Sequence, residues 1–198
     1  MMKRNALISV GVLLSVLGIV FMYALMSKIE HRRSLSLPEY FDIPEFSLAS
    51  TTGNRFGSED MAGKVSVLDF IFTTCMGPCP VMGTKMKLLY EEFAQEPTVQ
   101  LVSISVDPVR DTLPVLEDYA ERFGVTDNRW AFLREDNMER VAGIIENGFK
   151  LAADDLPFSH PVQLILIDPK GKIRGYYDGT LDADVDSLTA HIHHLLDN

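Results

Sequence analysis

The chain has 198 residues, of which 46% are hydrophobic and two are cysteine, and it carries 28 acidic against 18 basic residues. This composition excludes a disordered chain and a disulfide-stapled miniprotein, and the length predicts one domain. Five of the basic residues lie before residue 34, which leaves 13 basic and 27 acidic residues in residues 34–198, a net charge of 13 − 27 = −14. This charge argues against nucleic acid as a partner, because phosphate binding needs a basic surface.

An uncharged stretch near the start of the chain predicts a membrane anchor. The 21 residues 6–26 are almost all apolar, and a helix of that length spans about 30 Å, the core of a bilayer. A cleaved secretory signal is the alternative, but its apolar region is usually only about 7–15 residues long, and it ends in small residues where this chain has Met26. We therefore expect a short cytoplasmic segment at residues 1–5 and an uncleaved transmembrane helix at residues 6–27. Too few residues precede this helix for an organelle transit peptide, which favours a bacterial cytoplasmic membrane.

The rest of the chain predicts a tether and one α/β domain. Residues 28–44 form the tether, polar and with two prolines from residue 34 on, and residues 45–198 form the domain. Within the domain we expect a hairpin over residues 46–56, strands over residues 65–72, 99–106, 130–133, 162–168 and 173–177, and helices over residues 80–93, 113–123, 137–145 and 185–196. Because strands and helices alternate and a strand pair comes late, these elements predict a mixed sheet with helices on both faces.

Both cysteines, Cys75 and Cys79, lie between a predicted buried strand and the helix that follows it. Ligand sites in open α/β sheets form at this edge, and the amides at a helix start favour the thiolate and lower the pKa of a cysteine. Such a pair can close a disulfide, attack another disulfide or hold a thiophilic metal. Buried structural cysteine is the remaining alternative. Thioredoxin-type redox motifs keep two residues between their cysteines, and the three found here favour a metal.

Two thiolates leave a soft metal ion under-coordinated, which directs the search to a third ligand. His160 comes just before the predicted strand at residues 162–168, and in a thioredoxin-like sheet the loop before this late strand lies beside the cysteine loop. Two sulfurs and one imidazole suit Cu(I), and the same donors can hold Cu(II) with an added weak ligand. Zinc is the competing ion, although a structural zinc site takes four protein ligands.

Two clusters near the C-terminus are alternative metal sites that we do not favour. His191, His193 and His194 lie on the last predicted helix, where they are more typical of a solvated face. Three alternating aspartates resemble the start of a calcium loop but lack its glycine and distal glutamate, so they indicate the charge bias of a helix start. These are Asp182, Asp184 and Asp186.

Several sequence motifs, in the same order along the chain, resemble those of the Sco/SenC family of thioredoxin-fold copper proteins. Members of this family assist assembly of the copper centre in cytochrome c oxidase subunit II. The motifs are residues 70–80 around the cysteines, residues 104–112, residues 119–124, and His160 placed eight residues before Asp168. The resemblance covers most of residues 41–196. It implies a thioredoxin-like domain on the periplasmic side of a single-pass protein.

By this resemblance Cys75, Cys79 and His160 are the ligands of one copper ion, Cu(I) or Cu(II), and Asp107 is an acidic residue near the site that supports metallation. The implied partners are oxidase subunit II and a periplasmic thiol reductant. The alternative function is a thiol-disulfide oxidoreductase in which Cys75 attacks and Cys79 resolves the mixed disulfide. Met76 stands where the family usually has proline after the first cysteine, and Pro161 stands where it usually has serine after the histidine. These two departures leave the balance between the two functions open.

Overall fold

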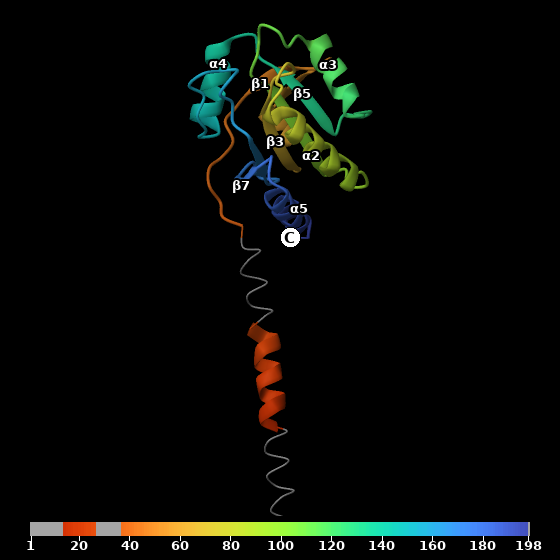
Figure 1. Cartoon of the computed structure of the whole chain (residues 1–198), viewed down its shortest axis with the longest axis vertical. Coiled ribbons are helices and arrows are strands. Elements are labelled where there is room, and N and C mark those ends of the chain that lie inside the picture. The colour runs from red at the N-terminus through yellow and green to blue at the C-terminus, as the bar shows by residue number, and fades with distance from the viewer. Residues whose placement is uncertain (1–13, 27–36, 198) are drawn as a thin grey trace, which may run out of the picture. The chain divides into compact units, whose positions relative to one another are not determined.

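The computed structural model describes residues 14–26 and 37–197 (Figure 1). The chain divides into two compact units, residues 1–37 and 38–198. Residues 14–26 are helical. Within the described ranges, no helix has the length and apolar character that crossing a membrane takes. The expected anchor at residues 6–27 extends beyond these ranges, and the expected cytoplasmic segment at residues 1–5 lies wholly outside them.

The unit at residues 38–198 is built on a seven-stranded mixed sheet (Figure 1). Along the sheet the order is β2-β1-β5-β4-β3-β6-β7, with β3, β4 and β5 parallel and the other neighbours antiparallel. The strands are β1 (Ser47–Ser50), β2 (Arg55–Gly57), β3 (Val65–Ile71), β4 (Val99–Ser105), β5 (Trp130–Arg134), β6 (Gln163–Ile167) and β7 (Ile173–Asp178). Every residue of β3 and β4 is buried, as the apolar residues on both faces of these strands predict for central strands.

Helices cover both faces of this sheet, as expected from the alternation of elements. They are α2 (Pro78–Glu92), α3 (Leu113–Arg122), α4 (Met138–Gly143) with a π-helical turn η2 (Ile144–Gly148), and α5 (Asp182–Leu196), and a short 3-10 helix η1 spans Ser58–Met61. On one face Trp130 of β5 packs against Tyr90 of α2 and Phe123 at the end of α3, with ring centroids 6.0 and 5.9 Å apart. On the other face Phe70 of β3 packs edge-on against Phe149 beside η2, at 5.5 Å.

The predicted elements are confirmed, with differences at their ends. Helix α2 begins at Pro78, two residues earlier than predicted, because proline at a first helical position lacks only an N–H that would have no partner there. The single helix expected at residues 137–145 is instead α4 followed by η2. The segment at residues 38–44, assigned to the tether from its sequence, packs in the second unit. There Tyr40 N–H donates to Ile173 O (3.0 Å) and Ile43 N–H to Gly171 O (2.9 Å).

The strand directions bring three loops to one edge of the sheet. The parallel strands β3 and β4 run in register from Val65↔Val99 to Ile71↔Ser105, so both end at the same edge. Strand β6 is antiparallel to β3, and therefore its beginning lies at that edge too. The loop after β3 carries Cys75, the loop after β4 carries Asp107, and the loop before β6 carries His160. This topology is what assembles the site.

Candidate metal centre

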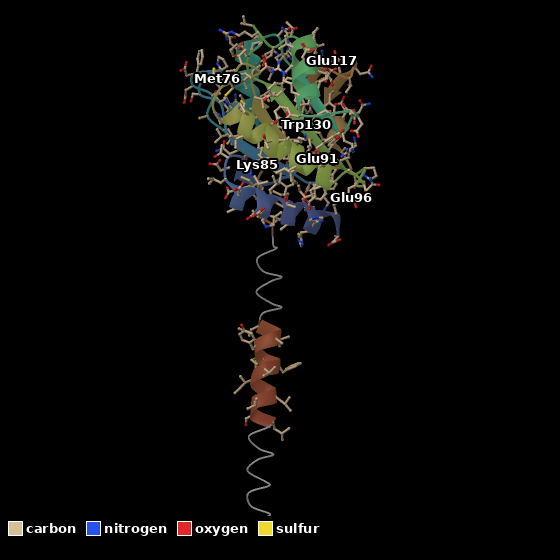
Figure 2. The ribbon with its side chains drawn as sticks, turned by 45° about the vertical axis from the view of Figure 1, so that its right-hand side comes forward. Met76, Lys85, Glu91, Glu96, Glu117 and Trp130 are labelled. Carbon is tan, nitrogen blue, oxygen red and sulfur yellow. The ribbon has the colours of Figure 1, made fainter. Side chains whose placement is uncertain are left out.

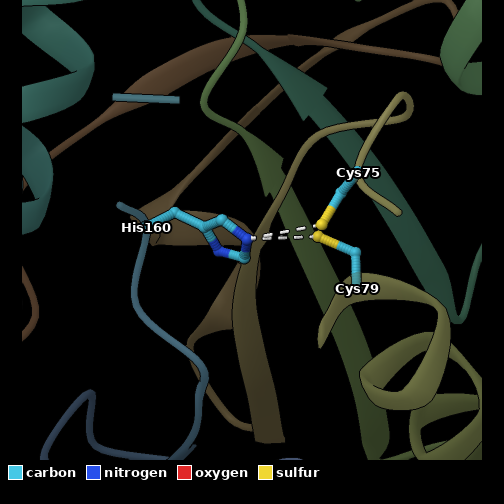
Figure 3. Close-up of side chains that lie close together, drawn as sticks. All are labelled: Cys75, Cys79 and His160. Carbon is cyan, nitrogen blue, oxygen red and sulfur yellow. Dashed lines mark hydrogen bonds between the residues drawn. The ribbon is translucent and has the colours of Figure 1, made fainter. Parts of the chain in front are cut away.

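Cys75, Cys79 and His160 converge at this edge, and their side chains point toward one another (Figure 3). The imidazole Nε2 lies 3.3 Å from the Cys79 Sγ and 4.0 Å from the Cys75 Sγ, and the three ligand atoms all lie within 4.8 Å of one another. In the part of the chain that the structure describes, this is the one group of three or more histidine, cysteine or acidic residues able to share a metal ion.

The two cysteines differ in their surroundings. Both are free thiols, with Cys79 fully buried in the first turn of α2 and Cys75 partly exposed in the loop before it. Burial raises the pKa of the Cys79 thiol, with hydrogen bonding and charge from Cys75 adding to the rise. The expectation that a helix start lowers cysteine pKa is therefore wrong for Cys79. The loss of water around its sulfur outweighs the helix amides.

His160 is held with one ring nitrogen toward the sulfurs. Its Nδ1 lies 3.0 Å from the carbonyl oxygen of Pro161, which can only accept, so Nδ1 carries the proton and Nε2 presents its lone pair. The ring packs edge-on against Phe72, with centroids 5.3 Å apart. Burial lowers the pKa of His160, since desolvation outweighs its backbone hydrogen bonds. The imidazole is therefore neutral at pH 7, as a metal ligand must be.

The donor set and spacing fit a soft metal ion. A three-coordinate ion with bonds of about 2.3 Å to sulfur and 2.0 Å to nitrogen holds its donors roughly 4 Å apart, close to the distances found here. Two sulfurs and one imidazole match the preferences of copper. The described residues bring no fourth protein donor to this group, which disfavours structural zinc.

Asp111 anchors the cysteine loop, a role that the sequence did not suggest. Its fully buried carboxylate accepts hydrogen bonds from the Thr73 backbone N–H (3.1 Å) and hydroxyl (2.6 Å) and from the Ser105 hydroxyl (2.6 Å). The sequence signal that could have found Asp111 is an acidic residue, four positions after Asp107, in the loop that leaves a neighbouring parallel strand.

Asp107, the predicted acidic residue near the site, is buried in the loop after β4. Its carboxylate accepts from the Arg110 guanidinium (2.8 Å) and backbone N–H (3.2 Å). Among the described residues no hydrogen bond joins Asp107 to Cys75, Cys79 or His160. Its role in metallation stays a prediction.

A third buried carboxyl, Asp69, lies on β3, the strand that leads into the cysteine loop. Asp69 is almost completely buried and accepts from the Ser103 hydroxyl (2.6 Å) through one oxygen, while its other oxygen has no hydrogen-bond partner among the described residues. Burial raises the pKa of Asp69 from its ordinary 3.8 to about 7, more than the Ser103 hydrogen bond lowers it. Asp69 is therefore partly protonated at neutral pH.

The C-terminal histidines do not form a metal cluster within the described residues. His191 Nδ1 hydrogen-bonds the Tyr177 hydroxyl (2.7 Å), so the prediction of a solvated face is wrong for this residue. The ring of His193 packs on Phe93 with centroids 4.9 Å apart. Asp182 lies in the first turn of α5 and pairs with Lys85 of α2, as a helix-start acid would.

The topology and the Cys2His group define a thioredoxin-like protein with a soft donor set. The chain belongs to the SCO1/SenC family, whose model matches residues 38–197. The SCO1 protein homolog of Bacillus subtilis is 25% identical over 160 residues, covering 78% of this chain and 83% of its own length. This finding confirms the resemblance stated from the motifs.

Solved structures agree with this assignment. A SCO1/SenC family lipoprotein from Bacillus anthracis is 29% identical, with a TM-score of 0.72, and the match covers 79% of this chain and 95% of that protein. The Arabidopsis thaliana ScoI with copper bound has the same fold, with a TM-score of 0.66 at 24% identity over 80% of this chain and 100% of that one. The thioredoxin-like fold expected from the sequence is thus confirmed.

Proposed function

We propose that this chain is a copper chaperone that binds one copper ion through Cys75, Cys79 and His160. It delivers the ion to the binuclear copper centre of cytochrome c oxidase subunit II. The observation that carries the proposal is the convergence of two sulfurs and a neutral imidazole within 4.8 Å. Copper-bound relatives of the same fold support the choice of metal. A relative described as a member of the Sco family of cytochrome c oxidase assembly proteins supports the choice of client.

The geometry favours release by ligand exchange at Cys75. This sulfur belongs to a partly exposed residue, whereas Cys79 is fully buried. An incoming thiolate or imidazole of the acceptor can approach beside Cys75 while the other two donors remain in place. Soft thiolates give tight Cu(I) binding, so release depends on geometry more than on weak affinity.

Titration of the reduced full-length chain with Cu(I), against a competing chelator, tests the proposal. We expect one Cu(I) per chain, an affinity tighter than micromolar, and transfer to the apo copper domain of subunit II. Loading with Zn(II) in a parallel titration should give weaker retention. Micromolar or weaker Cu(I) binding, or a chain that binds zinc in preference, would contradict the proposal.

We also propose that residues 6–27 anchor the chain in the bacterial cytoplasmic membrane, with the copper-binding domain in the periplasm. The uncharged apolar sequence of residues 6–26 supports this placement. Membrane fractionation and protease treatment of spheroplasts test it. The domain should be degraded in spheroplasts and protected in intact cells, and recovery of the full-length chain from the soluble fraction would overturn the anchor.

A thiol-disulfide oxidoreductase remains the second candidate, favoured by the contrast between a partly exposed Cys75 and a buried Cys79. In that function Cys75 attacks a client disulfide and Cys79 displaces the reduced client, closing a Cys75–Cys79 disulfide. A periplasmic thiol reductant then reopens the pair. Rapid turnover on a subunit II disulfide by a chain that holds no stable copper would make this the primary function.

A further inference from the structure

Three exposed apolar side chains belong to the loops that carry Cys75, Asp107 and His160. In residues 38–197 the large hydrophobic side chains with the highest exposure are Met76 (98%), Val109 (81%) and Phe158 (74%). Met76 follows Cys75 directly and projects from the edge of the molecule (Figure 2). Large apolar side chains that gather in one exposed place mark an interaction site more often than single ones do.

These side chains belong to the three loops that form the site, and the loops are joined by short contacts. Val109 lies two residues before Asp111, whose carboxylate holds the cysteine loop at Thr73. Phe158 lies two residues before His160, whose Nε2 lies 3.3 Å from the Cys79 sulfur. We call Met76, Val109 and Phe158 the apolar rim. Of its members, Met76 is the direct neighbour in sequence of the partly exposed Cys75.

The charges of the same loops indicate what covers the apolar rim. Residues 72–80, 106–112 and 149–161 contain four aspartates and two basic residues. Asp154 and Asp155 are exposed beside Phe158, whereas the exposed Arg110 is paired with Asp107. A second copy of this acidic domain would meet like charges there, and an anionic lipid surface would be repelled.

We infer that the apolar rim is the docking surface for the copper-accepting protein, a domain that presents soft ligands within an apolar patch bordered by basic side chains. The inference rests on the proposed function and adds the surface through which the transfer takes place. Docking there excludes water from the copper site and places the acceptor's ligands beside Cys75. Exposed apolar anchors of this kind carry much of the binding energy in small interfaces.

The test measures Cu(I) transfer from the full-length, loaded chain to two acceptors: the apo copper domain of subunit II and the small chelator bathocuproine disulfonate. The variant replaces the rim as Met76→Ser, Val109→Ser and Phe158→Ser. The matched control changes two exposed leucines outside these loops, Leu88→Ser and Leu181→Ser.

We expect the rim variant to transfer copper to the protein acceptor about tenfold more slowly, with its Cu(I) affinity and its transfer to the chelator within about twofold of wild type. The control should behave as wild type. Met76→Leu should also keep the wild-type rate, because it retains an apolar side chain and loses only the sulfur.

Unchanged transfer to the protein acceptor, or equal slowing in the control, would overturn the inference. The inference would also be overturned if the wild-type chain sedimented as a dimer and the rim variant did not. The same holds if the wild-type chain bound anionic vesicles and the rim variant did not. A wild-type chain that binds copper and passes none to the subunit II domain would instead overturn the proposed function, and the docking surface with it.

Discussion

Two regions of the molecule carry histidine, and they behave differently. The loop before β6 has one histidine, His160, and it faces two sulfurs. Helix α5 has three, His191, His193 and His194, and none of them joins a cluster of potential ligands among the described residues. In the first region a backbone carbonyl fixes Nδ1 and leaves Nε2 directed at the cysteines. In the second, the Tyr177 hydroxyl engages His191 Nδ1, and the ring of His193 packs on Phe93.

The difference between the two regions shows that, for a metal site, the orientation of a histidine matters more than the number of histidines nearby. A metal site needs a lone pair that is directed, neutral and close to other donors, and His160 has all three properties because burial and the Pro161 carbonyl impose them. The α5 histidines have ring nitrogens of the same intrinsic chemistry, but His193 lies on a different helix face from His191 and His194. The comparison can be broken or sharpened by four experiments.

Oxidation of Cys75 and Cys79 should have the largest effect. A disulfide removes both thiolates, and His160 with any help from the α5 histidines cannot hold Cu(I) tightly. We expect Cu(I) binding to be lost almost completely in the oxidised chain and restored by reductant, as measured by chelator competition. Equal affinity in the two redox states would mean that the cysteines are not the ligands.

Removal of histidines tests the comparison directly. His160→Ala should weaken Cu(I) binding by roughly a hundredfold or more, because loss of a direct ligand exceeds the 10–100-fold effect typical of changing a ligand's supporting partner. The matched variant with His191, His193 and His194 all changed to Ala should bind within about twofold of wild type. If the triple variant loses as much affinity as His160→Ala, the α5 histidines take part in binding.

The Asp69 carboxyl should make stability depend on pH. Its pKa is raised to about 7 in the folded state, so folding favours the protonated carboxyl. The protonated carboxyl therefore contributes fully to the stability of the fold below about pH 4, and this contribution is lost as the pH rises to 7. A shift of three pKa units corresponds to about 4 kcal/mol in the free energy of unfolding. The Asp69→Asn variant regains only part of this, because its buried amide N–H has no acceptor. We expect this variant to be about 2 kcal/mol more stable than wild type at pH 8, by urea unfolding. If the stability of Asp69→Asn relative to wild type did not increase between pH 5 and pH 8, the raised pKa of Asp69 would be contradicted.

Loosening the cysteine loop should have the smallest effect of the four. Asp111→Asn keeps the shape of the side chain but weakens the hydrogen bonds that fix Thr73. We expect Cu(I) affinity to fall about tenfold, with no change for Asp136→Asn, which removes the same charge from an exposed ion pair. An unchanged affinity in Asp111→Asn would show that the cysteines hold their positions without this anchor.

Much of the fold was predictable because its signals are local. The apolar runs of β3 and β4, the late strand pair and the helical periodicity of α2 and α5 each depend on a few neighbouring residues. The three ligands were also predictable. Both cysteines lie in one short sequence motif, and the position of His160 follows from the order of strands in a thioredoxin-like sheet.

The remaining features depend on contacts between distant residues. Thr73 and Asp111 are 38 positions apart, and an acidic residue in the loop after a neighbouring strand does not by itself indicate which group it contacts. The hydrogen bond of His191 to Tyr177 forms only after α5 packs on β7. The raised pKa of Cys79 arises from complete burial, which a helix-start pattern does not reveal.

The separation of Cys79 and His160 along the chain determines when copper can be loaded. These residues lie 81 positions apart, and closing a loop of that length in an unfolded chain costs about 4 kcal/mol in entropy. A chain that has not yet folded therefore offers only the two closely spaced cysteines. The full donor set appears once β3 and β6 pair. Under the proposed function, tight copper binding would therefore require a folded chain.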